Sequence, residues 1–349
     1  MNDELDEGRE SRVEGQKTNA AALLSDSRPS TLDPRLHLSP NQRAWHRFLR
    51  NRAAVISSYF MVAILLVILV WPLFNNPKVA SRLPKAMTQG PNSITDNQYS
   101  PPTTNNWMGT DVNGRDLLSR IFYGARISLL IGLVGAGVSL VIGVLWGAVA
   151  GYVGGRWDSA MMRLVDVLYS LPSIVFVIVL ITTLNGVLAK MQSQGLSSDW
   201  AKNAKFLALF VGLGAVSWLT MARIVRGQVL SLRTRNFVDA SRALGASHTR
   251  ILTRHILPNV YGIIIVYLTL TVPSIILYES FLSYLGLGIQ PPQASLGSLI
   301  ANGVEQINSI RIYWWLIIFP GGMLAATLLA LNFIGDGLRD AFDPRSEAR

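Results

Sequence analysis

The stretch NFVDASRALGASHTRILTRHILPN, residues 236–259, lies between two apolar segments and is itself polar. It contains one acidic residue, Asp239, followed by a cluster of small residues, and it ends near a Leu-Pro pair. Small side chains let a groove on another protein approach closely, while Asp239 and Arg242 can add polar contacts at its rim. A loop between membrane spans seldom needs such a pattern unless something docks on it, so the stretch predicts a docking surface.

Local preferences predict helices on both sides of a turn in this stretch. Residues 237–244 are expected to form a short helix, because Gly245 follows where a left-handed backbone conformation favours glycine. A second short helix is expected at about 247–256, and Pro258 then opens the next apolar segment, where a missing N–H is tolerated. The alternative is a plain amphipathic helix that lies on anionic lipid.

The composition is that of a membrane protein. Half of the 349 residues are hydrophobic, only 15% are charged and the mean hydropathy is +0.33, whereas soluble domains are about a quarter charged. The net charge of +10 comes from loops between apolar segments, which favours the positive-inside bias over nucleic-acid binding. There is no cysteine and the four histidines form no ligand cluster, so neither a disulfide nor a metal site is predicted.

Six apolar segments predict an all-α polytopic fold. Each is near the length of about 20 residues that crosses a bilayer, although Pro172 interrupts the third. The predicted spans are about 54–74, 126–151, 167–185, 204–222, 260–283 and 313–335. DVNGRD at 111–116 lacks the length and the final Glu of a Ca²⁺ loop, so it predicts a turn that caps the following helix.

Arginines predict the orientation and the domain organisation. Four of them lie within residues 43–52, directly before the first span, and seven lie in the loop 223–256. This bias places the N-terminus, this loop and the C-terminus in the cytoplasm. Three regions are predicted. They are a flexible cytoplasmic tail at 1–40, an interfacial helix, first span and external loop at 41–125, and a five-helix transmembrane domain at 126–346 that carries the loop 236–259.

Two features within the spans predict specific roles. Small residues recur at every fourth position of the second span, which predicts a helix-packing seam, either inside the chain or with a second subunit. Glu279 is the one acid inside an apolar span, and it either lines a substrate path or pins a helix end. The seam residues are Gly135, Ser139, Gly143, Gly147 and Gly151.

Four motifs, in order, resemble those of a known family. The loop 236–259 is similar to the "EAA" loop of ABC import permeases, with Asp239-Ala240-Ser241 where that family usually has Glu-Ala-Ala. WMGTDVNGRDLLSRIFYGARISL (107–129), FLSYLGLGIQPPQASLGSLI (281–300) and NFIGDGLRDAFDPR (332–345) resemble the C-type permease subunits of dipeptide and oligopeptide ABC importers. The resemblance covers roughly residues 41–346.

This resemblance implies one leading helix plus a five-helix core of the type I, MetI-like importer fold, in a bacterial inner membrane. It implies a transporter subunit rather than an enzyme, with an external solute-binding protein, two ATP-binding subunits, a second homologous permease and membrane lipid as partners, and no nucleic acid. Residues implied to contact the ATP-binding subunits are Asp239, Ala240, Ser241, Arg242, Gly245, Ala246, Leu257 and Pro258.

The chain has no GxxxxGK[ST] phosphate loop, so it is expected to bind no cofactor, with ATP and Mg²⁺ held by partner subunits. Dipeptides, oligopeptides, nickel chelates and glutathione-like peptides remain open as substrates. Two other classes of function would leave different signals in the sequence. A self-sufficient secondary transporter or channel would need ionisable residues in mid-membrane, and a membrane enzyme would need a polar catalytic cluster.

Overall fold

The computed structural model describes residues 39–74, 85–195, 198–307 and 311–342. The predicted tail at 1–40 therefore lies almost wholly outside the described residues. The chain divides into two compact units, Met1–Arg47 and Phe48–Arg349. A helix, α2, from Pro40 to Arg50, is present where the basic interfacial helix is predicted, and most of it belongs to the first unit.

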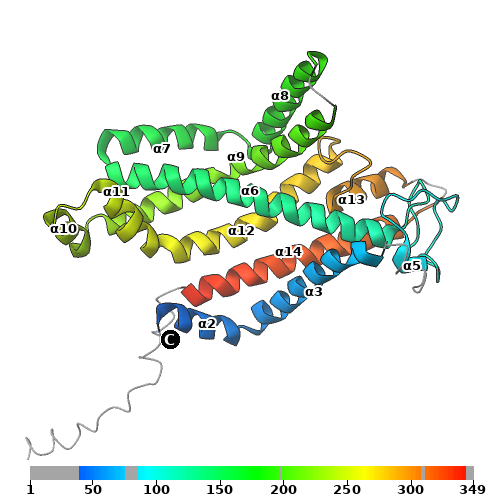
Figure 1. The fold of residues 1–349 in the computed structure, drawn as a ribbon, viewed down its shortest axis with the longest axis horizontal. Helices are drawn as coiled ribbons and strands as arrows, with labels where there is room; N and C mark the ends of the chain where they lie inside the picture. The colour runs from blue at the N-terminus through cyan, green and yellow to red at the C-terminus, as the bar shows by residue number, and fades with distance from the viewer. Residues whose placement is uncertain (1–38, 75–84, 196–197, 308–310, 343–349) are drawn as a thin grey trace, which may run out of the picture. The chain divides into compact units, whose positions relative to one another are not determined.

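Six helices in the described part of the chain are long and apolar enough to cross a membrane, which confirms the predicted polytopic all-α fold (Figure 1). Several extend beyond their predicted ends, since polar turns continue the apolar segments. The six are α3 (Arg52–Phe74), α6 (Leu117–Val153), α8 (Ser173–Ser193), α9 (Ser198–Leu232), α12 (Leu257–Tyr284) and α14 (Trp315–Phe342).

Shorter elements connect these six helices. The sequence analysis predicted two of these shorter helices, α10 and one near α11 and η2. It did not predict α5, α7 or α13 as separate elements. They are α5 (Lys85–Thr88), α7 (Gly155–Ser170), α10 (Asn236–Ala243), α11 (His248–Arg250), the π-helical η2 (Ile251–Ile256) and α13 (Leu296–Glu305).

The start of α6 is fixed by a capping turn, as the sequence predicts. The Asp116 carboxylate accepts a hydrogen bond from the Ser119 backbone N–H at 2.9 Å, and this satisfies one of the free donors of the first helical turn. Burial raises the pKa of Asp116, against the lowering effect of hydrogen bonds from Ser119 and Asn106. Upstream, Gly114 has a φ of +70°, which makes the turn that 111–116 requires.

The third span begins later than predicted. The expected range of 167–185 is wrong at its start, because Leu171 and Pro172 are extended and separate α7 from α8. A residue before proline disfavours the helical conformation, so the break occurs there. α7 is a polar helix that is tied to α9 by ion pairs, with Asp158 holding Arg226 at 2.6 Å and Asp166 holding Arg223 at 2.7 Å.

The small-residue seam lies inside the chain, against α9. All five seam residues are buried. A Cβ added at Gly143 would lie 2.9 Å from the Trp218 carbonyl oxygen, and one added at Gly151 would lie 2.7 Å from the Arg226 carbonyl oxygen. Without side chains on α6 the two backbones approach closely, which strengthens dispersion contacts between membrane helices.

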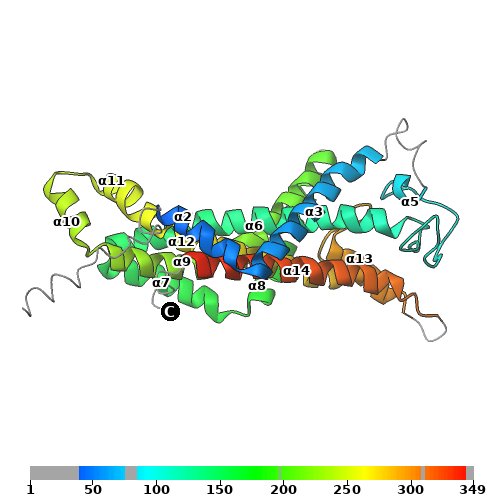
Figure 2. The ribbon, with the colours of Figure 1, turned by 90° about the horizontal axis from the view of Figure 1, so that it is seen from below.

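These contacts also fix the direction of the helices. Gly214 of α9 packs on Gly135 at the middle of α6, and later residues of α9 pack on Gly151 near the end of α6, so α6 and α9 run parallel (Figures 1 and 2). In contrast, Gly132 of α6 contacts Ile276 of α12, while Ser128, one turn earlier, meets Glu279, one turn later. The second and fourth spans are thus parallel and the fifth is antiparallel to both, as six successive crossings require.

We expect Gly143→Leu to destabilise the fold. The new Cβ would lie 2.6 Å from the Met221 Cβ, so α6 and α9 must separate, and overpacking of this kind costs about 1–3 kcal/mol or more. The measurement is the thermal unfolding of detergent-purified protein. Gly137→Leu is the matched control on the same helix, since nothing lies within 4 Å of its added Cβ. Equal unfolding temperatures for the two variants would contradict the seam.

Candidate functional site

Helix α10 ends in a well-defined turn at Gly245. The Gly245 N–H donates to the Arg242 carbonyl oxygen at 2.9 Å, and the Ala246 N–H donates to the Ser241 carbonyl oxygen at 3.1 Å. Gly245 has a φ of +78°. This pair of bonds with a left-handed glycine is the Schellman arrangement, so the predicted helix and its glycine stop are both present.

Most of α10 is exposed. Only Val238 is buried, packed with Ile251 and Ile256 of η2. Asp239 and Arg242 form an exposed ion pair along the helix at 3.2 Å. Two large apolar side chains that the sequence prediction did not include, Phe237 and Leu244, are 40% and 87% exposed. The sequence does contain a signal for them, because Phe237 and Leu244 are apolar residues near the ends of an otherwise polar helix. One apolar residue, Val238, is enough for the buried contact of α10.

The second arm of the loop differs from the prediction. A separate helix at 247–256 is wrong, because α11, η2 and α12 form one continuous helix from His248 to Tyr284. Ser247 caps its start. The Leu257 N–H donates to the Leu252 carbonyl oxygen, a π-type bond. Pro258 has no N–H and its ring crowds the preceding turn, so a widened turn before it lets the helix continue without a break.

The remaining predicted docking residues lie on this arm or at its base. Leu257 and Ala246 are partly buried against the cluster that contains Val238, and Pro258 lies in the first turn of α12. The end of α6 is tied to the same region, since Arg233 donates to the Tyr152 carbonyl oxygen at 3.0 Å. The eight predicted residues thus lie around the exposed turn at Gly245 and in the continuous helix that follows this turn.

Glu279 lies elsewhere, fully buried among serines. Its Oε1 accepts hydrogen bonds from the hydroxyl groups of Ser283 and Ser295, both at 2.6 Å. The Ser128 hydroxyl lies 3.5 Å from its Oε2. These partners come from α12, α6 and the cap of α13, so the carboxylate ties three elements together. This geometry favours the interpretation that Glu279 pins the C-terminal end of α12 over the one in which it lines a path.

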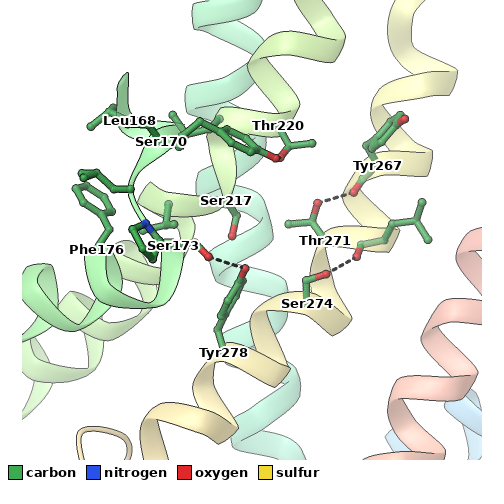
Figure 3. A pocket seen from close by; sticks show the side chains of 16 residues that line it. Leu168, Ser170, Ser173, Phe176, Ser217, Thr220, Tyr267, Thr271, Ser274 and Tyr278 are labelled. Carbon is green, nitrogen blue, oxygen red and sulfur yellow. Dashed lines mark hydrogen bonds between the residues drawn. The ribbon is translucent and has the colours of Figure 1, made fainter. Parts of the chain in front are cut away.

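A cavity of about 590 Å³ lies between the α7–α8 break, α9 and α12 (Figure 3). Nine of its 16 lining residues carry a hydroxyl group and none is charged. Figure 3 shows the hydroxyl groups of Ser173 and Tyr278 pointing toward one another, at 3.2 Å. The sequence-based prediction missed this feature, because charge and small residues in the spans do not reveal it, whereas hydroxyl groups at helical spacing could have done so.

The bundle and its exposed turn define a polytopic membrane protein that presents a short, mostly exposed helix, α10, between two of its spans. A family model described as "Binding-protein-dependent transport system inner membrane component" matches residues 143–347, which include α10 and the cavity. A second, described as "N-terminal TM domain of oligopeptide transport permease C", matches residues 39–102. The chain belongs to the family of binding-protein-dependent transport system inner membrane components.

Curated relatives agree over most of the chain. It is 45% identical over 304 residues to the oligopeptide transport system permease protein OppC of Escherichia coli K12, covering 87% of this chain and 91% of that one. It is 40% identical over 308 residues to the dipeptide transport system permease protein DppC of Bacillus subtilis 168, covering 88% and 87%. A structure of the MetNI methionine ABC transporter matches with a TM-score of 0.48 and 20% identity, covering 64% of this chain and 97% of that one.

The resemblance drawn from the four sequence motifs is thereby confirmed. The chain is a transmembrane permease subunit of a binding-protein-dependent ABC importer, and it spans the inner membrane several times.

We expect Glu279→Ala to lower the thermal stability of the subunit. The change leaves two serine hydroxyl groups buried without their acceptor, at a cost of about 1–3 kcal/mol for each group. Glu279→Gln keeps a carbonyl oxygen and should cost less. Thermal unfolding in detergent measures both, with Glu305→Ala, an exposed acid at the end of α13, as the control. A Glu279→Gln protein that unfolds like wild type and yet transports nothing would instead support a role in the path.

Proposed function

We propose that this chain is one of two homologous permeases of a peptide importer and that α10 couples it to ATP hydrolysis on separate subunits. The substrate class rests on relatives whose names are those of oligopeptide and dipeptide permeases. The coupling role rests on one observation. The exposed helix α10 ends at a glycine in the left-handed conformation, and a continuous 37-residue helix, His248–Tyr284, begins a few residues later.

The proposed assembly places the chain with a second permease, two ATP-binding subunits and an extracytoplasmic solute-binding protein. ATP and Mg²⁺ are bound by the partner subunits and not by this chain. Arginines before α3 and in the loop 223–256 support a cytoplasmic location for the N-terminus, α10 and the C-terminus. In agreement, Gly337 near the end of α14 packs on Ala54 at the start of α3, and Gly262 near the start of α12 packs on Phe342.

The proposed mechanism follows from the contacts around α10. A nucleotide-driven displacement of α10 reaches α12 through the packing of Val238 on Ile251 and Ile256. Because no break separates His248 from Tyr284, the displacement tilts the whole helix. At the far end of α12 the Glu279 cluster passes the movement to α6 and α13. Alternation between inward-open and outward-open states follows from such tilting.

We expect Gly245→Leu to separate ATP hydrolysis from transport. An added Cβ meets no neighbour within 4 Å, but the φ of +78° strains any residue with a Cβ by roughly 1 kcal/mol, so the turn reorients. In proteoliposomes that hold the complete importer, ATP hydrolysis should continue while peptide uptake falls severalfold. Gly227→Leu is the control, since it also has open space but no positive φ. Uptake at the wild-type rate in the Gly245→Leu complex would exclude this coupling role.

We expect Arg242→Glu to weaken association with the ATP-binding subunits. The reversal removes the cation from the exposed rim of α10 and places a carboxylate beside Asp239, so two like charges face the partner. Co-purification of the ATP-binding subunits after detergent extraction should fall severalfold. Arg339→Glu, an exposed reversal near the end of α14, is the matched control. Undiminished co-purification with Arg242→Glu would show that α10 makes no such contact.

A further inference from the structure

The cavity between α7–α8, α9 and α12 has a lining suited to one kind of ligand. Its volume of about 590 Å³ is within the range of about 300–1,000 Å³ that is typical of small-molecule sites. It lies along the central part of α12, from Tyr267 to Tyr278, and the central part of α9, from Val216 to Thr220. The site is thus placed within the membrane-spanning bundle.

Two of its hydrogen bonds join separate elements. The Tyr169 hydroxyl group at the end of α7 pairs with Thr220 of α9 at 3.2 Å. The Ser173 hydroxyl group at the start of α8 pairs with Tyr278 of α12 at 3.2 Å. Both pairs are exposed to the cavity, so an entering polar group can replace either partner without leaving a buried group unsatisfied.

Other hydroxyl groups in the lining keep free acceptor capacity. Thr271 donates to the Tyr267 carbonyl oxygen at 2.6 Å, and Ser274 donates to the Leu270 carbonyl oxygen at 3.3 Å (Figure 3). A hydroxyl oxygen that donates its proton still has two lone pairs. The lining therefore offers both exchangeable donors and standing acceptors.

Two opposite charges at the border of the cavity are paired with each other. Arg223 lies one helical turn beyond Thr220, and its guanidinium group binds Asp166 at 2.7 Å and stacks over the Tyr169 ring at 4.1 Å. Their opposite charges leave the cavity with a neutral lining and a neutral border on this side.

We propose that this cavity is a transmembrane subsite that binds the main chain of a passing peptide through exchangeable neutral hydroxyl groups. The proposal rests on the peptide-importer function. A peptide main chain carries one N–H donor and one C=O acceptor per residue, and a hydroxyl group can serve either. A charged lining would retain peptides of opposite charge and repel those of like charge. A neutral hydroxyl lining instead handles peptides of different side-chain charge alike.

The first test removes one exchangeable pair. Ser173→Ala combined with Tyr278→Phe keeps the shape of the cavity and deletes both hydroxyl groups. In proteoliposomes with the complete importer, uptake of Ala-Ala-Ala, Ala-Lys-Ala and Ala-Glu-Ala should each fall about fivefold relative to wild type. Tyr284→Phe, an exposed tyrosine on the same helix outside the cavity, is the control and should leave uptake unchanged.

The outcomes separate the two proposals. If the wild-type complex moves none of the three peptides, the peptide function fails and the subsite fails with it. If the wild-type complex moves all three and the double variant matches it, the subsite alone is wrong. Loss confined to one charge class would also overturn it, since a main-chain site does not discriminate by side-chain charge.

A second test stays informative if the double variant assembles poorly. The chain has no cysteine, so Ser274→Cys introduces a single exposed thiol into the cavity. In the complete importer, a methanethiosulfonate reagent should modify this thiol, Ala-Ala-Ala should slow the modification severalfold during turnover, and the modification should stop uptake. Thr182→Cys, on α8 outside the cavity lining, is the matched control and should show no peptide protection. If the thiol introduced by Ser274→Cys stays unreactive, the cavity is filled by lipid or by the second permease, and the subsite is overturned.

Discussion

The backbone of α6 packs closely on the backbone of α9 because the five seam residues of α6, four glycines and a serine, have no side chain or a small one. This contact decides how the other elements can be placed. With α6 and α9 parallel and in contact from Gly135 to Gly151, the intervening α8 must cross back beside them, and the polar segment between α6 and α8 has no room inside the bundle. That segment becomes α7, whose two aspartates pair with Arg223 and Arg226 on the outer side of α9. In a membrane, where apolar side chains gain little by leaving lipid, close backbone packing is one of the few ways to hold two helices together.

In the proposed mechanism, the α6–α9 pair stays fixed while the continuous helix that contains α12 tilts relative to it. α12 is antiparallel to α6 and contacts it through Gly132 and the Glu279 cluster, toward the C-terminal end of α12. The N-terminal end of α12 continues without a break into the arm that packs on Val238 of α10. A widened π turn before Pro258 is what keeps this arm in line with the span. A flexible joint at that point would absorb movement, whereas a continuous helix transmits it to the far end.

The sequence predicted the parts of this arrangement that depend on neighbours in the chain. The six spans, the capping turn at 111–116 and the glycine stop of α10 follow from local periodicity and local backbone preference. The family was evident from four motifs.

Errors arose where local and longer-range effects compete. The start of the third span was wrong because apolar residues before Pro172 carry the pattern of a span while the Leu171–Pro172 conformation breaks it. A helix over 247–256 is present as α11 and η2, but its predicted separation from the fifth span was wrong, because a π turn lets the helix continue past Pro258.

The roles of individual side chains within the spans depend on contacts that no local pattern encodes. Glu279 is notable in the sequence as a lone acid, yet two of its three serine partners lie on other elements, one of them 151 positions away in sequence. Four of the nine hydroxylated residues of the cavity stand at helical spacing on α12, but the other five come from the end of α7, the start of α8 and α9, so no local pattern shows that they line one cavity. The distribution of charge is nevertheless consistent: Glu279 is held by hydrogen bonds away from the cavity, and Arg223 and Asp166 neutralise one another at its border. If the cavity is the proposed peptide subsite, this arrangement suits it, because a path for solutes of different charge must keep fixed charges out of its lining or in matched pairs.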